Sequence, residues 1–273
     1  MQKNVDFRSF GLGAALTLSA LALGCGGVET TGGDTSNPAP TPTTPAATPE
    51  PSTQAPAAAP EFPANSGQAA KPTIAYPAGP YGINVGSVAP DFVWMGFQNA
   101  TLKNDVASMQ VIRLADFYNP HVADDTYAPA SPAEDDRLYT AELYGAGTPK
   151  PKALAIDIGS VWCGPCNQEA KTVLPPLYLK YKPLGGEFLL QLGDGADGGV
   201  PATPKDLFNW TKKYKVNFPA TIDPDYKLGE LFAANAWPAN VIIDTRTMKI
   251  VYAVAGVPGD AYWAKFEKVL NAN

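Results

Sequence analysis

Short runs of alternating or β-branched apolar residues recur six times after residue 90 and predict six β-strands. The runs are DFVWMGF (91–97), MQVIRLADF (109–117), ALAIDI (153–158), EFLLQL (187–192), NVIID (240–244) and KIVYAVAG (249–256). Four other segments carry apolar residues at helical spacing, namely 163–181, 203–214, 223–234 and 259–272. Strands that alternate with helices, followed by a strand pair and a terminal helix, predict an α/β domain with a mixed sheet covered on both faces.

Two of the predicted helices contain clear boundary signals. Thr203 can cap the helix that follows it, Pro204 takes its first position, and Asp206 falls at the third, beside the positive end of the helix dipole. In the helix predicted after residue 162, Pro175 and Pro176 predict a bend or a break, because Pro176 removes an intrahelical hydrogen bond and clashes with the preceding turn.

Residues 118–150 have no clear period and are rich in turn-forming residues, which indicates an irregular surface excursion. The only histidine of the chain, His121, lies in it. We expect His121 to be a solvated loop residue rather than a ligand or a base.

The N-terminus has the pattern of an export signal. Lys3 and Arg8 precede an apolar run that ends just before Cys25, and this run is shorter than the roughly 20 residues of a membrane span. Small residues before a cysteine resemble the cleavage site of bacterial lipoproteins, although Ala22 stands where leucine is usual. We therefore predict a signal peptide over 1–24 and a lipid on Cys25, with an ordinary secretory signal or an uncleaved anchor as the alternatives.

Residues 25–72 consist largely of proline, threonine, alanine and serine. Such a composition cannot bury enough apolar surface to offset the entropy of ordering, so it predicts a disordered segment. Its prolines favour extended conformations of about 3.1 Å per residue. The segment is typical of a tether that holds a domain away from a membrane.

The remaining residues, 73–273, have the length of one domain. The chain has 20 basic and 26 acidic residues, a net charge of −6, and no basic stripe along the sequence, so nucleic acid is not an expected partner. Of the three cysteines, lipidation would account for Cys25, which leaves Cys163 and Cys166 as one pair.

The Cys163-Gly164-Pro165-Cys166 motif lies where an apolar strand runs into a helix. Unpaired N–H groups and the helix dipole favour a thiolate there, and a free thiol pKa near 8.5 can fall to about 7 or lower in such a motif. Pro165 fits the helix start. The spacing predicts a nucleophile, Cys163, that is exposed, and a buried resolving partner, Cys166.

The segment AIDIGSVWCGPC resembles the active-site strand and turn of thioredoxins, with Trp162 directly before the motif. The resemblance implies that Asp157 is a buried proton acceptor for Cys166, and a carboxyl between Ile156 and Ile158 would have a raised pKa. A solvent-facing Asp157 at the strand end is the alternative. Ile158 and Gly159 stand where thioredoxins usually have aromatic residues.

The segment AWPANVIID resembles the thioredoxin segment in which a cis-proline faces the disulfide. The resemblance implies that Pro238 is cis and that Trp237 meets the substrate. Together with Trp162, Gly164 and Pro165 of the redox motif, these two residues form the implied substrate-binding surface.

Two further segments indicate the branch of the family. VGSVAPDF (85–92) resembles the redoxin group, and residues 204–244 resemble exported, membrane-tethered reductases of the TlpA and ResA type, as does the acidic Glu169. The resemblance covers about 83–272 and implies a three-layer α/β/α fold. It also implies a periplasmic enzyme that reduces protein disulfides, takes electrons from a membrane thiol donor, and needs no cofactor beyond its own disulfide. Glu169 would then tune the pKa of the site.

Other functions stay open. Zinc needs about four ligands, and only His121 joins the cysteine pair as an obvious soft donor, so no metal is expected. The DGADGG run (194–199) fits a plain turn better than a calcium loop. A peroxiredoxin-like antioxidant peroxidase is the main rival, although Ile156 stands where its usual motif has proline. The third alternative is a lipoprotein with an inert disulfide, but so short a loop stabilises little.

Overall fold

The computed structural model describes residues 74–99, 105–122, 124–131, 134–139, 144–228 and 236–272. The predicted signal peptide (1–24), its Cys25 and the predicted tether (25–72) lie outside the described residues. Among the described residues, no helix has the length and apolar character needed to cross a membrane.

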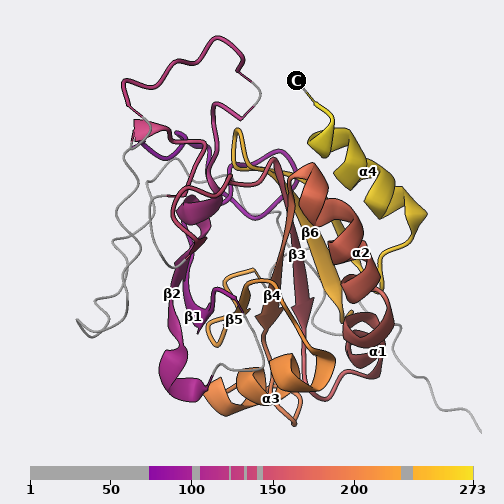
Figure 1. Ribbon diagram of the computed structural model, residues 1–273. Helices are drawn as coiled ribbons and strands as arrows, with labels where there is room; N and C mark the ends of the chain where they lie inside the picture. The colour runs from indigo at the N-terminus through magenta and orange to yellow at the C-terminus, as the bar shows by residue number, and fades with distance from the viewer. Residues whose placement is uncertain are drawn as a thin grey trace, which may run out of the picture. The chain divides into compact units, whose positions relative to one another are not determined.

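The described part of the chain is built on a mixed sheet with the strand order β2-β1-β5-β4-β3-β6-β7 (Figure 1). The strands are β1 (Val93–Phe97), β2 (Gln110–Arg113), β3 (Ala153–Gly159), β4 (Gly186–Leu192), β5 (Ala220–Ile222), β6 (Ala239–Asp244) and β7 (Lys249–Ala255). Strands β3, β4 and β5 are parallel, whereas β1 pairs with β5, and β6 with β3, in the antiparallel direction. β2 and β7 add antiparallel strands at the two ends.

All six predicted strands are present, and the second ends earlier than predicted. β2 stops at Arg113 because the Asp116 carboxylate accepts the Arg113 backbone N–H (3.0 Å), while Asp91 accepts that of Ala115 (2.9 Å). These bonds tighten Leu114–Phe117 into a 3₁₀-helix, η2. The sequence analysis missed β5, which has three residues and too short a pattern to detect.

Four α-helices are described, namely α1 (Gly164–Thr172), α2 (Leu174–Tyr181), α3 (Pro204–Tyr214) and α4 (Asp260–Leu270). Shorter 3₁₀-helices are η1 (Val106–Ser108) and η5 (Lys182–Leu184). The predicted break of the first helix is confirmed and falls at Val173, next to the proline pair. The predicted cap is also confirmed, since the Thr203 hydroxyl accepts the Asp206 N–H (3.2 Å) and the Asp206 carboxylate accepts the Thr203 N–H (2.9 Å).

Alternation along β3 divides its side chains between two apolar cores. Ala153 and Ala155 contact the core under the α-helices, whereas Leu154, Ile156 and Ile158 face the opposite core. Helices α1, α2 and α4 lie along the first face, and α3 packs against β5 at the end of the same face (Figure 1). By the same alternation, Asp157 points to the helical side.

The second face is covered by less regular structure. Its core includes Trp94, Phe117 and Tyr144, which come from β1, η2 and the excursion. The helix predicted at 223–234 is wrong for residues 223–228, which form turns, and residues 229–234 lie outside the described residues. The mixed sheet with its helical layer is the predicted thioredoxin-like α/β arrangement.

The N-terminal side of the domain lies against the sheet edge at the start of β7. The N–H of Gly86 donates to the Ile250 carbonyl (2.7 Å), the N–H of Ile250 donates to the Ser87 carbonyl (3.0 Å), and the N–H of Ala89 donates to the Met248 carbonyl (2.9 Å). The backbone of residues 86–89 therefore covers part of β7, which is an outer strand of the sheet.

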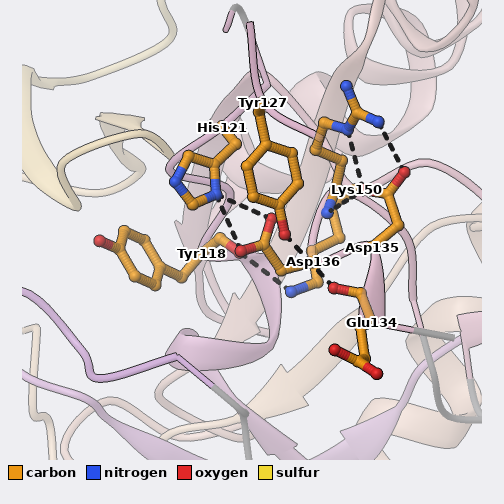
Figure 2. A network of polar contacts seen from close by, with 8 residues as sticks. Tyr118, His121, Tyr127, Glu134, Asp135, Asp136 and Lys150 are labelled. Atoms are coloured by element: carbon orange, nitrogen blue, oxygen red, sulfur yellow. Dashed lines mark hydrogen bonds and ion pairs between the residues drawn. The ribbon is translucent and has the colours of Figure 1, made fainter. Parts of the chain in front are cut away.

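In the excursion, His121 lies in a turn, as predicted, but it is only partly solvated. Its side chain is 34% exposed, its Nδ1 lies 2.8 Å from the buried Asp136 carboxylate, and its ring stacks on Tyr127 at 3.9 Å (Figure 2). The carboxylate and the aromatic ring replace part of the water around the imidazole. The described residues of 118–150 otherwise form turns, as predicted.

Candidate active site

Cys163 and Cys166 form a disulfide at the start of α1, with their Cα atoms 5.3 Å apart. Cys163 is the N-cap of the helix, and its Sγ accepts the backbone N–H of Cys166 at 3.1 Å. A negative charge that develops on this sulfur would therefore face a donor and the positive end of the helix dipole. This geometry distinguishes Cys163 from Cys166.

The prediction that Cys163 is exposed is wrong for the disulfide form. Cys163 and Cys166 are both only 2% exposed. Cys163 belongs to the apolar core on the helical face, and Val161 and Trp237 pack against this core. Exposure therefore does not distinguish the two sulfurs, and any difference in reactivity must come from their electrostatic surroundings.

Gly159, the last residue of β3, lies beside Cys166. A Cβ atom on Gly159 would lie 3.8 Å from Cys166 Sγ, in ordinary van der Waals contact. The glycine that departs from the thioredoxin pattern thus leaves a side-chain-free space beside this sulfur. Asp157, two residues earlier, points to the same side of the strand.

Asp157 and Glu169 form a buried carboxyl pair on the helical face of the sheet. Asp157 is 6% exposed and Glu169 is fully buried. Burial raises the pKa of Asp157 to about 7. Burial, and then the charge of Asp157, raise the pKa of Glu169 to about 10, while the neighbouring Asn240 side chain acts in the opposite direction. The predicted burial of Asp157 is confirmed, and the alternative of a solvent-facing aspartate is wrong.

Three oxygens of this pair lack hydrogen bonds to the described residues. They are Oδ1 of Asp157 and both carboxylate oxygens of Glu169. A buried carboxylate without donors is costly, so the pair retains protons at a pH at which exposed carboxyls have lost them. Because the two groups interact, their protons dissociate in steps that belong to the pair. The site therefore contains a proton acceptor and donor that is suited to neutral pH.

Trp162 is held by a residue that the sequence analysis missed. Its indole is 45% exposed, and its Nε1 donates to the Asp194 carboxylate at 2.9 Å. Asp194 also accepts the N–H of Gly199 (3.0 Å) and the hydroxyl of Tyr226. Burial acts to raise the pKa of Asp194, but these three hydrogen bonds outweigh it and hold that pKa below its usual range.

The same loop is also joined to the redox motif through the backbone. The N–H of Val161 donates to the Asp194 carbonyl (3.1 Å), and the N–H of Trp162 donates to that of Gly195 (3.3 Å). The DGADGG run is thus a turn, as predicted, but one that supports the active-site loop. The sequence pattern that could have indicated this role is an aspartate followed by glycines, but the same pattern occurs in many turns that have no such role.

The segment before β6 borders the same region. The Trp237–Pro238 peptide bond is cis, as predicted, and Pro238 is buried. The half-buried Trp237 ring packs over Gly193, since a Cβ there would come within 2.9 Å of the indole. Gly164 and Pro165, between the two cysteines, are exposed at the start of α1.

No protein-family model matches the chain. Among curated proteins, it is similar to the thiol-disulfide oxidoreductase ResA of a Bacillus cereus strain, with 28% identity over 107 residues, which are 39% of this chain and 57% of that protein. ResA of Bacillus thuringiensis subsp. konkukian is 27% identical over the same shares. The chain thus matches little more than half of the length of these relatives. They agree with the predicted resemblance to ResA-type thiol-disulfide oxidoreductases.

Among solved structures, the chain resembles a Chlorobium tepidum protein assigned to thiol:disulfide interchange protein DsbE. The identity is 18% and the TM-score 0.46, over 70% of this chain and 100% of that one. It also resembles the thioredoxin domain of a thiol-disulfide oxidoreductase from Bacteroides vulgatus, with 18% identity and a TM-score of 0.42, over 69% of this chain and 99% of that one.

Proposed function

We propose that this protein is a membrane-tethered, extracytoplasmic thiol-disulfide oxidoreductase that reduces disulfides in other proteins. The observation that carries the proposal is the Cys163–Cys166 disulfide at a helix start, on the same side of the sheet as a buried carboxyl pair. A cysteine pair that only stabilised the fold would need no buried acid nearby, and a loop this short constrains the unfolded chain little.

In the proposed reaction, the thiolate of Cys163 in the reduced enzyme attacks one sulfur of a substrate disulfide. A bond forms between Cys163 and that sulfur, the substrate S–S bond breaks, and the other substrate sulfur leaves as a thiolate. The Cys166 thiol then passes its proton to Asp157, and its thiolate attacks the Cys163 sulfur, so that the mixed-disulfide bond breaks and the second substrate sulfur leaves as a thiolate. The enzyme ends with its own disulfide, and the substrate has gained two electrons as two thiolates, one of which takes the proton from Asp157 and the other a proton from water.

The surroundings suit these two roles. The N–H of Cys166 and the start of α1 stabilise the thiolate of Cys163. A general base works best when its pKa lies near the working pH, and burial raises the pKa of Asp157 to about 7. Glu169 would act through Asp157 as a positioning residue, because the two charges disfavour each other.

The substrate surface and the electron supply belong to the same proposal. Trp162, Gly164 and Pro165 surround the nucleophile, and Trp237 with Pro238 forms the opposite wall, where an incoming peptide would meet the disulfide. Reduction of the Cys163–Cys166 disulfide then takes two electrons from a membrane thiol donor. The enzyme itself uses no cofactor other than this disulfide.

The location rests on the N-terminal sequence. A lipid on Cys25 would hold the protein at the outer side of a membrane, and residues 26–72 would let the domain reach its partners.

The test is to trap substrates with Cys166→Ser in cells, where an unresolved mixed disulfide on Cys163 should accumulate and release identifiable proteins on reduction. Cys163→Ser is the matched control and should trap none. The purified parent protein should reduce insulin with dithiothreitol and consume hydrogen peroxide slowly. Fast peroxide consumption that persists in Cys166→Ser would instead support the peroxidase alternative.

A further inference from the structure

A groove of about 380 Å³ opens directly beside the redox motif. It lies between α1 and the C-terminal end of α3. Its lining consists of Gly164, Asn167, Gln168, Lys171, Lys213 and Tyr214. The lining includes two lysines and no acidic residue.

The groove belongs to a larger basic area. The segment 205–215 carries four lysines and one aspartate, a net charge of +3, and α1 adds Lys171. Within the described residues, none of these five lysines forms an ion pair, whereas Lys180, Lys182 and Lys227 each pair with a carboxylate. The chain as a whole has a net charge of −6, so this area has the opposite sign to the rest of the protein.

Asn167 links the groove to the nucleophile. Its side-chain N–H groups donate to the carbonyls of Cys163 (2.7 Å) and Val161 (3.0 Å). Its Oδ1 accepts a hydrogen bond from Lys213 Nζ (3.1 Å) and one from the Tyr214 hydroxyl. The Asn167 side chain therefore connects Lys213 to the main chain of Cys163.

We infer that this groove binds an acidic segment next to the reactive cysteines of the partner protein. The inference rests on the proposed function, because a protein disulfide that reaches Cys163 must cover the exposed Gly164 and Pro165. Residues that flank the partner's cysteine then lie over Lys171 and Lys213. Carboxylates there meet two lysines that form no ion pair within the described residues, and exposed charges at the rim of an interface act mainly by speeding association.

The test compares two disulfide-containing peptides that differ only in the residues flanking the cysteine, glutamate in one and glutamine in the other. At low ionic strength the parent protein should reduce the glutamate peptide about five to ten times faster, in kcat/KM, than the glutamine peptide. Because the lysines are exposed, about 0.5 M salt should remove most of this preference.

Two double variants locate the effect. Lys171→Glu with Lys213→Glu should bring the ratio of the two rates to about one or below, and the milder pair Lys171→Gln with Lys213→Gln should lower it without new charge. Lys152→Glu with Lys249→Glu is the control. These exposed lysines lie at the ends of β3 and β7 that are far from the cysteines. The control should keep the preference of the parent.

Equal rates for the two peptides with the parent protein overturn the inference and leave the proposed function standing. A preference that survives both groove variants also overturns it. If the groove variants lose binding to vesicles of anionic phospholipid while the peptide preference stays, the groove faces a membrane and the inference is wrong. If the parent reduces neither peptide, the proposed function fails and the inference fails with it.

Discussion

The indole N–H of Trp162 donates a hydrogen bond to the buried carboxylate of Asp194 at 2.9 Å. This contact joins the residue before Cys163 to the loop after β4, 32 residues further along the chain. Tyr226 and the N–H of Gly199 bind the same carboxylate, so one charge holds three segments together. The position of the half-exposed indole at the site depends on this charge.

Asp194→Asn should therefore lower stability and free the indole. The amide presents one acceptor oxygen in place of two, so a buried donor loses its partner, at a cost of about 1–3 kcal/mol. Denaturant midpoints and Trp162 fluorescence measure both effects. Asp197→Asn, an exposed residue of the same loop, is the matched control and should change neither.

The same variant should alter acid stability. The folded-state pKa of Asp194 is lowered, so its contribution to stability is present above the unfolded pKa of about 3.9 and is lost as pH falls through the folded value. Midpoints of parent and Asp194→Asn should thus converge below about pH 4. A constant gap down to pH 2 would contradict this assignment.

Asp157→Asn should separate catalysis from stability. Because burial raises the pKa of Asp157 to about 7, the folded state binds more protons than the unfolded one between about pH 4 and 7, and the parent loses stability as pH rises through that range. The amide removes this loss, so the variant should be at least as stable at pH 7 and above. The disulfide-reduction rate from about pH 6 to 9 should fall, since Cys166 lacks its proton acceptor. An unchanged rate would show that Asp157 has no part in the reaction.

Glu169→Gln should stabilise the protein at alkaline pH. Burial and then the charge of Asp157 raise the pKa of Glu169 to about 10, so the parent loses stability as pH rises from about 4 to about 10, where the unfolded chain has released this proton and the folded state still holds it. The gain of Glu169→Gln should be smaller when Asp157→Asn is already present, because the repulsion between the two charges is then absent. Additive gains in this double-mutant cycle at pH 9 would mean that the carboxyls do not interact.

The cysteines of the reduced protein should react in a fixed order. Both are equally buried in the disulfide form, so access does not favour either one, but only Cys163 accepts a helix N–H at its sulfur. Brief alkylation at neutral pH followed by peptide mapping should label Cys163 first, by about tenfold or more if its pKa lies one unit lower. Cys163→Ser and Cys166→Ser provide the reference rate of each thiol alone.

The lipid anchor has its own test. Cys25→Ser should either release the protein in soluble form or leave the precursor uncleaved, and the parent should carry lipid on Cys25. Membrane fractionation and mass spectrometry of the N-terminal peptide measure both. Unchanged membrane attachment in Cys25→Ser would exclude lipidation as the tether.

Local patterns predicted the features that depend on neighbours in the sequence. The six strands, the break at Pro175-Pro176 and the Thr203 cap are set within a few residues of where they occur. The side of the sheet on which Asp157 lies is similar, because the period of a strand places it opposite to the two core isoleucines, but its burial depends on the helices that cover that side.

Features that depend on distant partners could not be predicted. The carboxylate of Asp194 is important because of Trp162 and Tyr226, each 32 residues away. The basic groove combines Lys171 with Lys213, which no single stretch of sequence presents as a stripe. The burial of Cys163 and the pairing of His121 with Asp136 likewise depend on side chains that only the fold brings near.

The contact between Gly86–Ala89 and the start of β7 has a consequence for self-association. An outer strand with free N–H and C=O groups is a template on which a second chain can add a strand and begin to aggregate. Here the protein's own backbone occupies that template at Ile250 and Met248. Copies present at high concentration would therefore find this part of the sheet edge already occupied.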